Sequence, residues 1–287
     1  MKKIIAILVL ILMVFSLASC RVGDIEVALY APYWNFWSYS KGSSFTYDAS
    51  QIKKVYITWV GGEIDIVASD ADELSVSENS EGLADDAKMH YYIKGEKLII
   101  HYSKALYREE VDTTKKHLRV EIPEGIELDI DSVNADITIG EMALGSMKLT
   151  NVSGDVTFSG LVCSEVNIEN VDGFVSAKEI VADTFSANGV AGSISVTRIV
   201  ANKIKVKTVS GLTELGIAKE SEVSISGMSG DVKLGINEEK GAIIEFSTMS
   251  GTFSSNIQHT TSKKTHIFGN GEIQVDVETI SGNLHVS

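Results

Sequence analysis

Two aspartates, Asp136 and Asp155, are the residues of this sequence whose spacing most resembles a catalytic pair. They hold the same place in two consecutive repeats. Stacking of those repeats would set the carboxylates about 5 Å apart, as in retaining glycosidases, and would raise one pKa. The next repeats carry Phe174, Ser193 and Leu212 at this place. We therefore interpret the aspartates as exposed turn residues and predict no catalytic site, with a glycan-active enzyme as the less favoured alternative.

The histidines and the second cysteine add no further chemistry. The six histidines show no spacing that would set two ligands on one face of an element, and no phosphate loop or nucleophile elbow occurs. The sequence thus predicts no metal and no cofactor. Cys163 falls in an apolar column of the repeats with Leu144, Ala182 and Ala201. This position predicts a small buried side chain and not a reactive thiol.

The other cysteine, Cys20, closes a segment built like a lipoprotein signal peptide. Two lysines precede an apolar run over residues 4–15, which is short for a bilayer span. Leu17-Ala18-Ser19-Cys20 then resembles the lipobox of bacterial lipoproteins, which implies that Cys20 receives a diacylglyceryl group and becomes the mature N-terminus. We predict a signal peptide over 1–19 and an extracytoplasmic, membrane-anchored protein. An ordinary signal peptide or an uncleaved anchor is the alternative.

Residues 20–43 form a predicted lipidated tether that carries a dense run of aromatic residues. Trp34 and Trp37 within it are candidate contacts with a partner. The rings could cap the end of the fold, lie at a membrane interface, where rings with a polar tip are favoured, or contact a glycan. The sequence leaves these three interpretations open.

The strongest pattern is a repeat of about 19 residues centred on a small residue, and a fixed period near 20 residues is typical of a solenoid. The last two intervals are longer, at 21 and 31 residues. We predict that each small residue occupies a sharp turn, where glycine adopts φ > 0 at little cost. These structural turn residues are Ala135, Gly154, Gly173, Gly192, Gly211, Gly230, Gly251 and Gly282.

Apolar residues recur seven, five and two positions before each small residue and two and four positions after it. Spacing by two predicts two short strands per repeat with alternate side chains facing inward. Val190→Asp is accordingly expected to unfold the body, because it would place an unpaired charge inside the stack. The column two positions before the small residue is Val133, Val152, Val171, Val190, Val209, Met228, Met249 and Ile280.

These patterns predict an all-β protein, a parallel β-helix or related β-solenoid with rungs of about 19 residues. Residues 126–287 hold the regular repeats, and residues 44–125 form an irregular, strand-rich N-terminal region of the same solenoid. The polar stretch 258–264 is the expected projecting loop, where a binding site could lie. A net charge of −14 argues against nucleic acid as a partner, because phosphate contacts need clustered Lys and Arg.

The Val-Glu-Ile-Pro run at 120–123 and the Val-Ser-Gly-Asp-Val unit at 152–156 resemble those of bacterial envelope proteins of domain of unknown function 4097. Met-Ser-Gly-Asp-Val at 228–232 matches the same unit. The family is described as adhesins, so the resemblance implies a β-solenoid and a surface role, without catalytic residues. We predict a non-catalytic protein that presents a surface to an envelope protein, a glycan or a host surface. The alternative is an accessory or regulatory lipoprotein of an envelope-stress system that binds a membrane partner.

Overall fold

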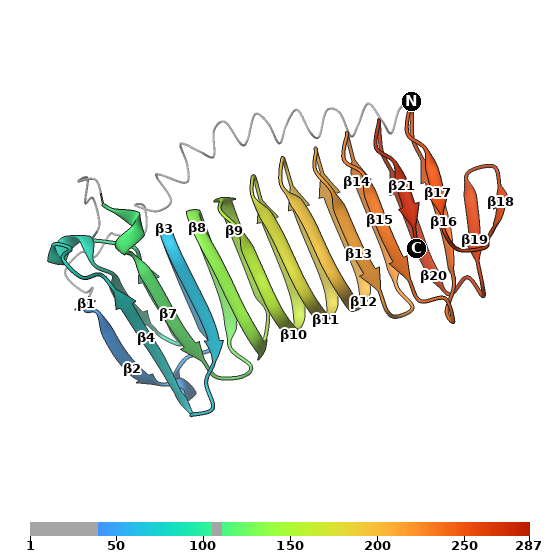
Figure 1. Ribbon diagram of the computed structural model, residues 1–287. Coiled ribbons are helices and arrows are strands. Elements are labelled where there is room, and N and C mark those ends of the chain that lie inside the picture. Colours follow the sequence, from blue (N-terminus) through green and yellow to red (C-terminus); the bar gives the residue numbers. More distant parts are fainter. Residues whose placement is uncertain (1–39, 105–110) are drawn as a thin grey trace.

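The computed structural model describes residues 40–104 and 111–287. The strands of these residues form one 21-stranded sheet, wound into a straight stack of rungs (Figure 1). The all-β solenoid predicted from the repeats is confirmed. Three short 3₁₀ turns accompany the strands, and no helix in the described ranges has the length and apolar character needed to cross a bilayer.

The first half of the described chain contains β1 (Ser40–Lys41), β2 (Ser44–Asp48), η2 (Ala49–Gln51), β3 (Lys54–Ala68), β4 (Glu73–Asn79), η3 (Asp85–Ala87), β5 (His90–Lys94), β6 (Lys97–His101), η4 (Thr113–Lys115), β7 (His117–Ile122), β8 (Glu127–Ala143), β9 (Met147–Ser153) and β10 (Val156–Asn170). The second half contains β11 (Phe174–Gly189), β12 (Ser193–Thr208), β13 (Thr213–Ile217), β14 (Glu222–Gly227), β15 (Val232–Ile236), β16 (Ala242–Ser247), β17 (Phe253–Ser255), β18 (Thr260–Ser262), β19 (Thr265–Phe268), β20 (Ile273–Glu278) and β21 (Leu284–Val286).

Equivalent residues of neighbouring rungs lie side by side in parallel register. Val156 of β10 pairs with Val175 of β11, and Val175 pairs with Ile194 of β12. In β10, β11 and β12 one long strand runs through a bend, where the ladder pairing is interrupted. From β13 onward each rung consists of two short strands. The prediction of two short strands per repeat therefore describes the later rungs, whereas in the earlier ones the chain stays extended around the bend.

The core is a set of apolar columns along the axis of the stack. Four of the five predicted columns are buried, as Val166, Ile168, Val156 and Phe158 illustrate, each at most 1% exposed. They lie respectively seven and five residues before, and two and four after, a turn glycine. Each buried side chain of this kind stabilises the fold by about 1.5–3 kcal/mol, so these columns hold the rungs together.

The fifth column, two residues before the glycine, faces outward. Val190 is partly exposed and outside the core and Val171 is 38% exposed, so the basis for expecting Val190→Asp to unfold the body is wrong. Because side chains alternate along a strand, the residue three positions before the glycine faces inward, like those seven and five positions before it. That residue is polar in several rungs: Asn151 and Asn170 are 0% and 4% exposed. The chain turns immediately after it, which breaks the two-residue period.

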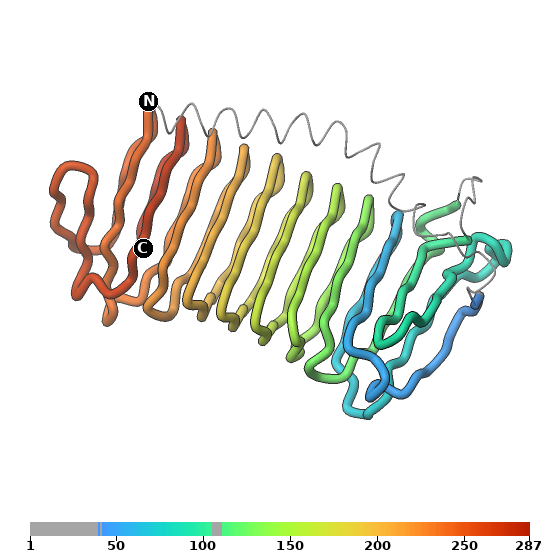
Figure 2. Tube along the Cα trace, turned by 180° about the vertical axis from the view of Figure 1, so that it is seen from behind, coloured from blue at the N-terminus to red at the C-terminus, as the bar shows by residue number. Residues whose placement is uncertain are grey.

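Rung order departs from chain order near both ends of the stack. At the N-terminal end, β3 lies between β8 and the pair β6 and β7, all parallel to it. At the C-terminal end, β20 pairs with β14 on one side and β16 on the other. Similarly, β21 lies between β15 and β17. The last rung of the chain is thus inserted between two earlier ones (Figures 1 and 2), which accounts for the long final interval of the repeat.

Antiparallel strands close the parallel stack at each end. At the N-terminal end, β4 pairs with β7 and β5 pairs with β6 in antiparallel register. At the other end, β19 pairs antiparallel with β16, and β18 pairs with β19. The stretch 258–264, predicted to be a projecting loop, instead forms much of this hairpin. Covering an open strand edge in this way removes a template for aggregation.

Candidate binding surface

Where a serine precedes the turn glycine, its hydroxyl connects the rung to a neighbouring one. Ser153 Oγ donates to the carbonyl of Val133 at 3.1 Å. Ser210 Oγ donates in the same way to the carbonyl of Val190 at 3.2 Å. The Val190 carbonyl also accepts from the backbone N–H of Ser210 at 2.9 Å, so the hydroxyl adds a second hydrogen bond between the two rungs.

Where an aspartate follows the turn residue, its carboxylate connects the rung to the next one in the stack. Asp136 Oδ1 accepts from the backbone N–H of Asp155 at 2.9 Å, and Asp155 Oδ1 accepts from that of Phe174 at 2.8 Å. Asp231 makes the same bond to the N–H of Asn283, in the rung beside it in space. The two predicted neighbours Asp136 and Asp155 therefore do lie in one column, but each carboxylate caps a backbone amide at an exposed corner. The geometry supports a structural role and not general acid–base catalysis.

The turn glycines are required because neighbouring rungs approach closely. A Cβ at Gly192 would lie 2.0 Å from the carbonyl oxygen of Gly173, and one at Gly173 would lie 2.3 Å from that of Gly154. Such distances exclude any side chain. Positive φ, the reason predicted from the sequence, applies to part of the column: Gly154, Gly173 and Gly211.

A polar column inside the corner was missed by the sequence analysis. Asn151 Nδ2 donates to the carbonyl of Gly154 at 3.1 Å, and Asn170 Nδ2 donates to that of Gly173 at 3.2 Å. These amides hold the turn from within. Their inward direction could have been predicted, because each lies two residues after a member of the inward apolar column five positions before the glycine.

Cys163 is half-buried against the core, in register with Ala182 as predicted. Burial raises the pKa of its thiol to about 11. Since the thiolate is the reactive form, this cysteine is poorly suited to nucleophilic or redox chemistry.

The histidines are engaged in packing at the two ends of the stack. His266 stacks on Phe253 and His259 on Phe268 in the C-terminal hairpin region. At the N-terminal end, burial lowers the pKa of His101 to about 4. No group of three His, Cys, Asp or Glu that could hold a metal ion occurs in residues 40–104 and 111–287.

A buried ion pair lies in the N-terminal cap, by which we mean residues 40–104 and 111–122 with the antiparallel strands β4 and β5. The sequence did not predict this pair. The ammonium of Lys116 contacts the Glu78 carboxylate, and both side chains are fully buried. Lys116 Nζ also donates to the carbonyls of Ala87 and Tyr102, at 2.8 and 2.6 Å, and lies 4.9 Å from the ring centre of Trp59. Three acceptors thus surround the ammonium. The pair fastens separate segments of the cap to one another.

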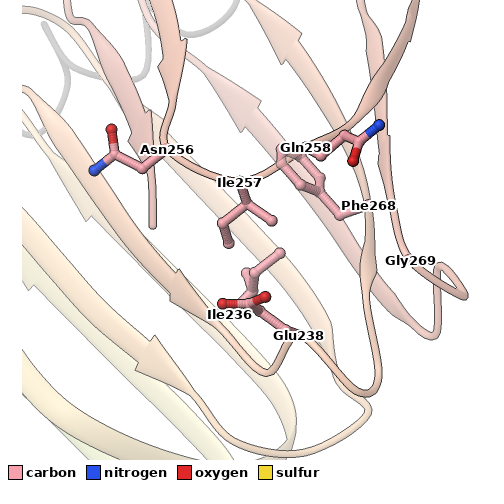
Figure 3. A pocket seen from close by; sticks show the side chains of 7 residues that line it. All are labelled: Ile236, Glu238, Asn256, Ile257, Gln258, Phe268 and Gly269. Carbon is pink, nitrogen blue, oxygen red and sulfur yellow. The ribbon is translucent and has the colours of Figure 1, made fainter.

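A hollow of about 310 Å³ lies at the C-terminal end of the stack. Ile257 points toward Ile236 there, and Phe268 stands beside them (Figure 3). Glu238 supplies the one carboxylate in the lining. The hollow offers apolar contact and one charge, without a pair of convergent titratable groups.

The feature best suited to binding is the outward apolar column, which we call the corner stripe. It places one apolar side chain at the surface of every rung, about 4.8 Å apart along the axis. None of its members is among the side chains that pack on the described core, and Met249 is 68% exposed. Val171 and Met249 are exposed and the other members are partly exposed, and a row of apolar side chains at the surface suits an interaction with a partner. In spatial order the corner stripe is Val133, Val152, Val171, Val190, Val209, Met228, Ile280 and Met249.

The predicted lipidation site Cys20 and the candidate partner contacts Trp34 and Trp37 lie outside the described residues. The same is true of the predicted signal peptide over 1–19.

A model of the family described as Toastrack DUF4097 matches residues 51–287. A solved structure named a "putative adhesin", from Bacteroides fragilis, is 11% identical with a TM-score of 0.50, over 85% of this chain and 96% of that chain. A "putative lipid binding protein" from Parabacteroides distasonis is 16% identical with a TM-score of 0.47, over 88% and 98%. A "putative adhesin" from Parabacteroides merdae is 13% identical with a TM-score of 0.46, over 88% and 97%. No curated protein matches the chain.

Proposed function

This chain belongs to the Toastrack DUF4097 family, and from that premise we propose that it is a non-catalytic adhesion protein of the bacterial cell surface. The observation that carries the proposal is the corner stripe, an apolar row that faces outward along the regular rungs of a rigid stack. The name of the Bacteroides fragilis structure supports the same role. The partner is a component of the envelope, a glycan or a host surface.

Attachment to the membrane is part of this proposal. Cys20, at the end of the lipobox-like segment, would carry two acyl chains and serve as the mature N-terminus. Each buried CH₂ contributes about 0.8 kcal/mol, and two chains anchor a protein stably where one does not. The body would then project from the membrane at the end of the aromatic tether.

A non-catalytic role accords with the chemistry of the corner. The aspartates that come nearest to a catalytic pair are occupied by backbone amides of the following rung. The free thiol has a raised pKa. Neither feature supports a reacting centre, so the surface itself is the functional part.

The test compares binding of the full-length protein and its variants to bacterial cells and cell-wall preparations. Changing Val152, Val171 and Val190 together to Ser should abolish binding while leaving the fold intact, because these side chains face outward. The matched control changes Val162, Val181 and Val200 to Ser, three outward valines at another bend of the rungs. Equal binding by the two variants would refute the corner stripe as the adhesive surface.

A second arm addresses the accessory role. Changing Trp34 and Trp37 to Ala leaves the residues of the corner stripe unchanged. Loss of a crosslinked membrane partner in this variant, with no effect of the corner-stripe variant, would favour a regulatory lipoprotein over an adhesin.

A further inference from the structure

Three lysines lie on one outward face of a single strand. Lys203, Lys205 and Lys207 alternate along β12 with the buried residues Ile204 and Val206. At about 3.3 Å per residue, the three lysine side chains leave the strand about 6.6 Å apart. The side chain of Lys203 is 69% exposed. We call these three residues the lysine row.

The neighbours of the lysine row are mostly uncharged. On one side, Thr184, Ser186 and Asn188 of β11 pair with the three lysines. On the other side, β14 places Ser224 and Ser226 beside Lys205 and Lys207. The exception is Glu222, which lies 3.8 Å from Lys203 in an exposed pair. An exposed pair of this kind contributes little and is screened by salt.

Carboxylates lie on the outer face two strands away from β12 on either side. Glu165 and Glu169 stand on the outer face of β10, and Asp276 and Glu278 on that of β20. Among the outward positions of β10, β11, β12, β14 and β20 in this area, positive charge is therefore confined to β12, in a protein whose net charge is −14. An anionic chain would be attracted along β12 and repelled on both flanks.

We propose that the lysine row binds an anionic polysaccharide, with the lysines contacting its carboxylate or phosphate groups. The hydroxyl and amide side chains on β11 and β14 supply hydrogen-bond partners for sugar hydroxyls. The outward positions of β10, β11, β12, β14 and β20 in this area carry no apolar side chain that could enter a bilayer. These features favour a polar polymer over a lipid surface. The inference goes beyond the proposed function, because it assigns a second binding surface, separate from the corner stripe, to a different class of ligand.

The test measures binding of polygalacturonate, with neutral dextran as the comparison, to the full-length protein. Replacing all three lysines of the row with Gln should weaken polygalacturonate binding at least tenfold. The matched control, Lys148→Gln with Lys178→Gln and Lys233→Gln, removes the same charge from three exposed but scattered positions and should change it less than twofold. Binding should also weaken as salt rises.

Several results would overturn the inference. These are no binding of polygalacturonate by the unmodified protein, equal weakening in the two lysine variants, or equal binding of dextran. Binding to phosphatidylglycerol vesicles with the same lysine dependence, but not to polygalacturonate, would identify a membrane contact instead. The corner-stripe variant should retain polygalacturonate binding. If the unmodified protein fails to bind cells yet binds polygalacturonate, the proposed function fails and the lysine row stands.

Discussion

At the level of single residues, the Ser-Gly-Asp corners are held by hydrogen bonds and close contacts between adjacent rungs. Serine reaches back to the preceding rung, aspartate reaches forward, and the glycine between them leaves room for a carbonyl oxygen. The Ser-Gly-Asp unit is thus a joint in which each position has a different steric or hydrogen-bonding task. A substitution at one of these positions should therefore lower stability according to the contact that it removes or blocks, although surface turns in general tolerate substitution.

Gly192→Ala and Gly189→Ala test the steric part of this joint. A Cβ at Gly192 would lie 2.0 Å from a backbone oxygen, whereas one at Gly189 would have ordinary contacts, the nearest at 3.6 Å. Overpacking of this kind costs about 1–3 kcal/mol, so Gly192→Ala should lower the free energy of unfolding by at least that range. Gly189→Ala should leave it nearly unchanged. Urea denaturation of both variants decides the matter, and similar midpoints would contradict the close-approach explanation.

At the level of elements, the rung formed by β20 and β21 keeps the parallel register of the repeats although it does not follow its neighbour in the chain. Val223 pairs with Val275 in the same parallel register that it would have with the next repeat in the chain. The rung formed by β20 and β21 therefore needs nothing from residues 239–270 to pair with β14 and β15. Those residues supply the outermost rung and the hairpin that covers it.

Deleting residues 239–270 should consequently preserve the solenoid. The deletion leaves four residues between β15 and β20, as many as the connection 218–221 between β13 and β14. We expect β-type circular dichroism and a cooperative but less stable unfolding transition, with a greater tendency to associate because β20 becomes an open edge. The comparison variant ends at residue 258 and loses β18 to β21. It should be the less stable of the two, since β16 and β17 lose their partners β20 and β21 and must move to pair with β14 and β15; the opposite ranking would contradict the inserted order.

Much of this architecture could be predicted from the sequence, because the buried columns at seven and five residues before the glycine are local patterns. The direction of Val190 could not be predicted from its apolar character alone, since the two-residue alternation ends at the corner. Rung order was also out of reach. Edges built from equivalent repeats accept one another equally well, so only the whole stack determines which repeat lies beside which. The buried pair of Lys116 and Glu78 joins segments whose proximity no local pattern indicates.

At the level of the whole molecule, the two ends of the stack share a sensitivity to acid. Burial lowers the pKa of His101 to about 4 and also lowers the pKa values of His90 and His266. The first two belong to the N-terminal cap and the third to the C-terminal hairpin. Unfolding exposes these rings and restores their ordinary pKa, near 6.5.

The free energy of unfolding should therefore fall as pH decreases from about 6.5 toward 4. In that window the unfolded chain binds protons that the folded protein excludes. For His101 alone the loss reaches about 3 kcal/mol at most, at about 1.4 kcal/mol per pKa unit. Urea denaturation at pH 7.5 and 4.5 measures it. His101→Gln should reduce the difference between the two pH values, and His285→Gln serves as the control; an unchanged difference in His101→Gln would refute the assignment.

The displaced terminal rung has a consequence for biogenesis. A chain that emerges from a ribosome or an export channel with its N-terminus first presents β16 and β17 before β20 and β21 exist. The segment 242–255 cannot take its final neighbours until residues 273–286 have emerged, because these residues lie between it and β14 and β15 in the folded protein. Repeats up to residue 236 can stack as they emerge, but the native order of the outer rungs must wait for residues 273–286. A chain interrupted between residues 255 and 273 would thus lack the strands that separate β14 from β16 and β15 from β17 in the folded protein.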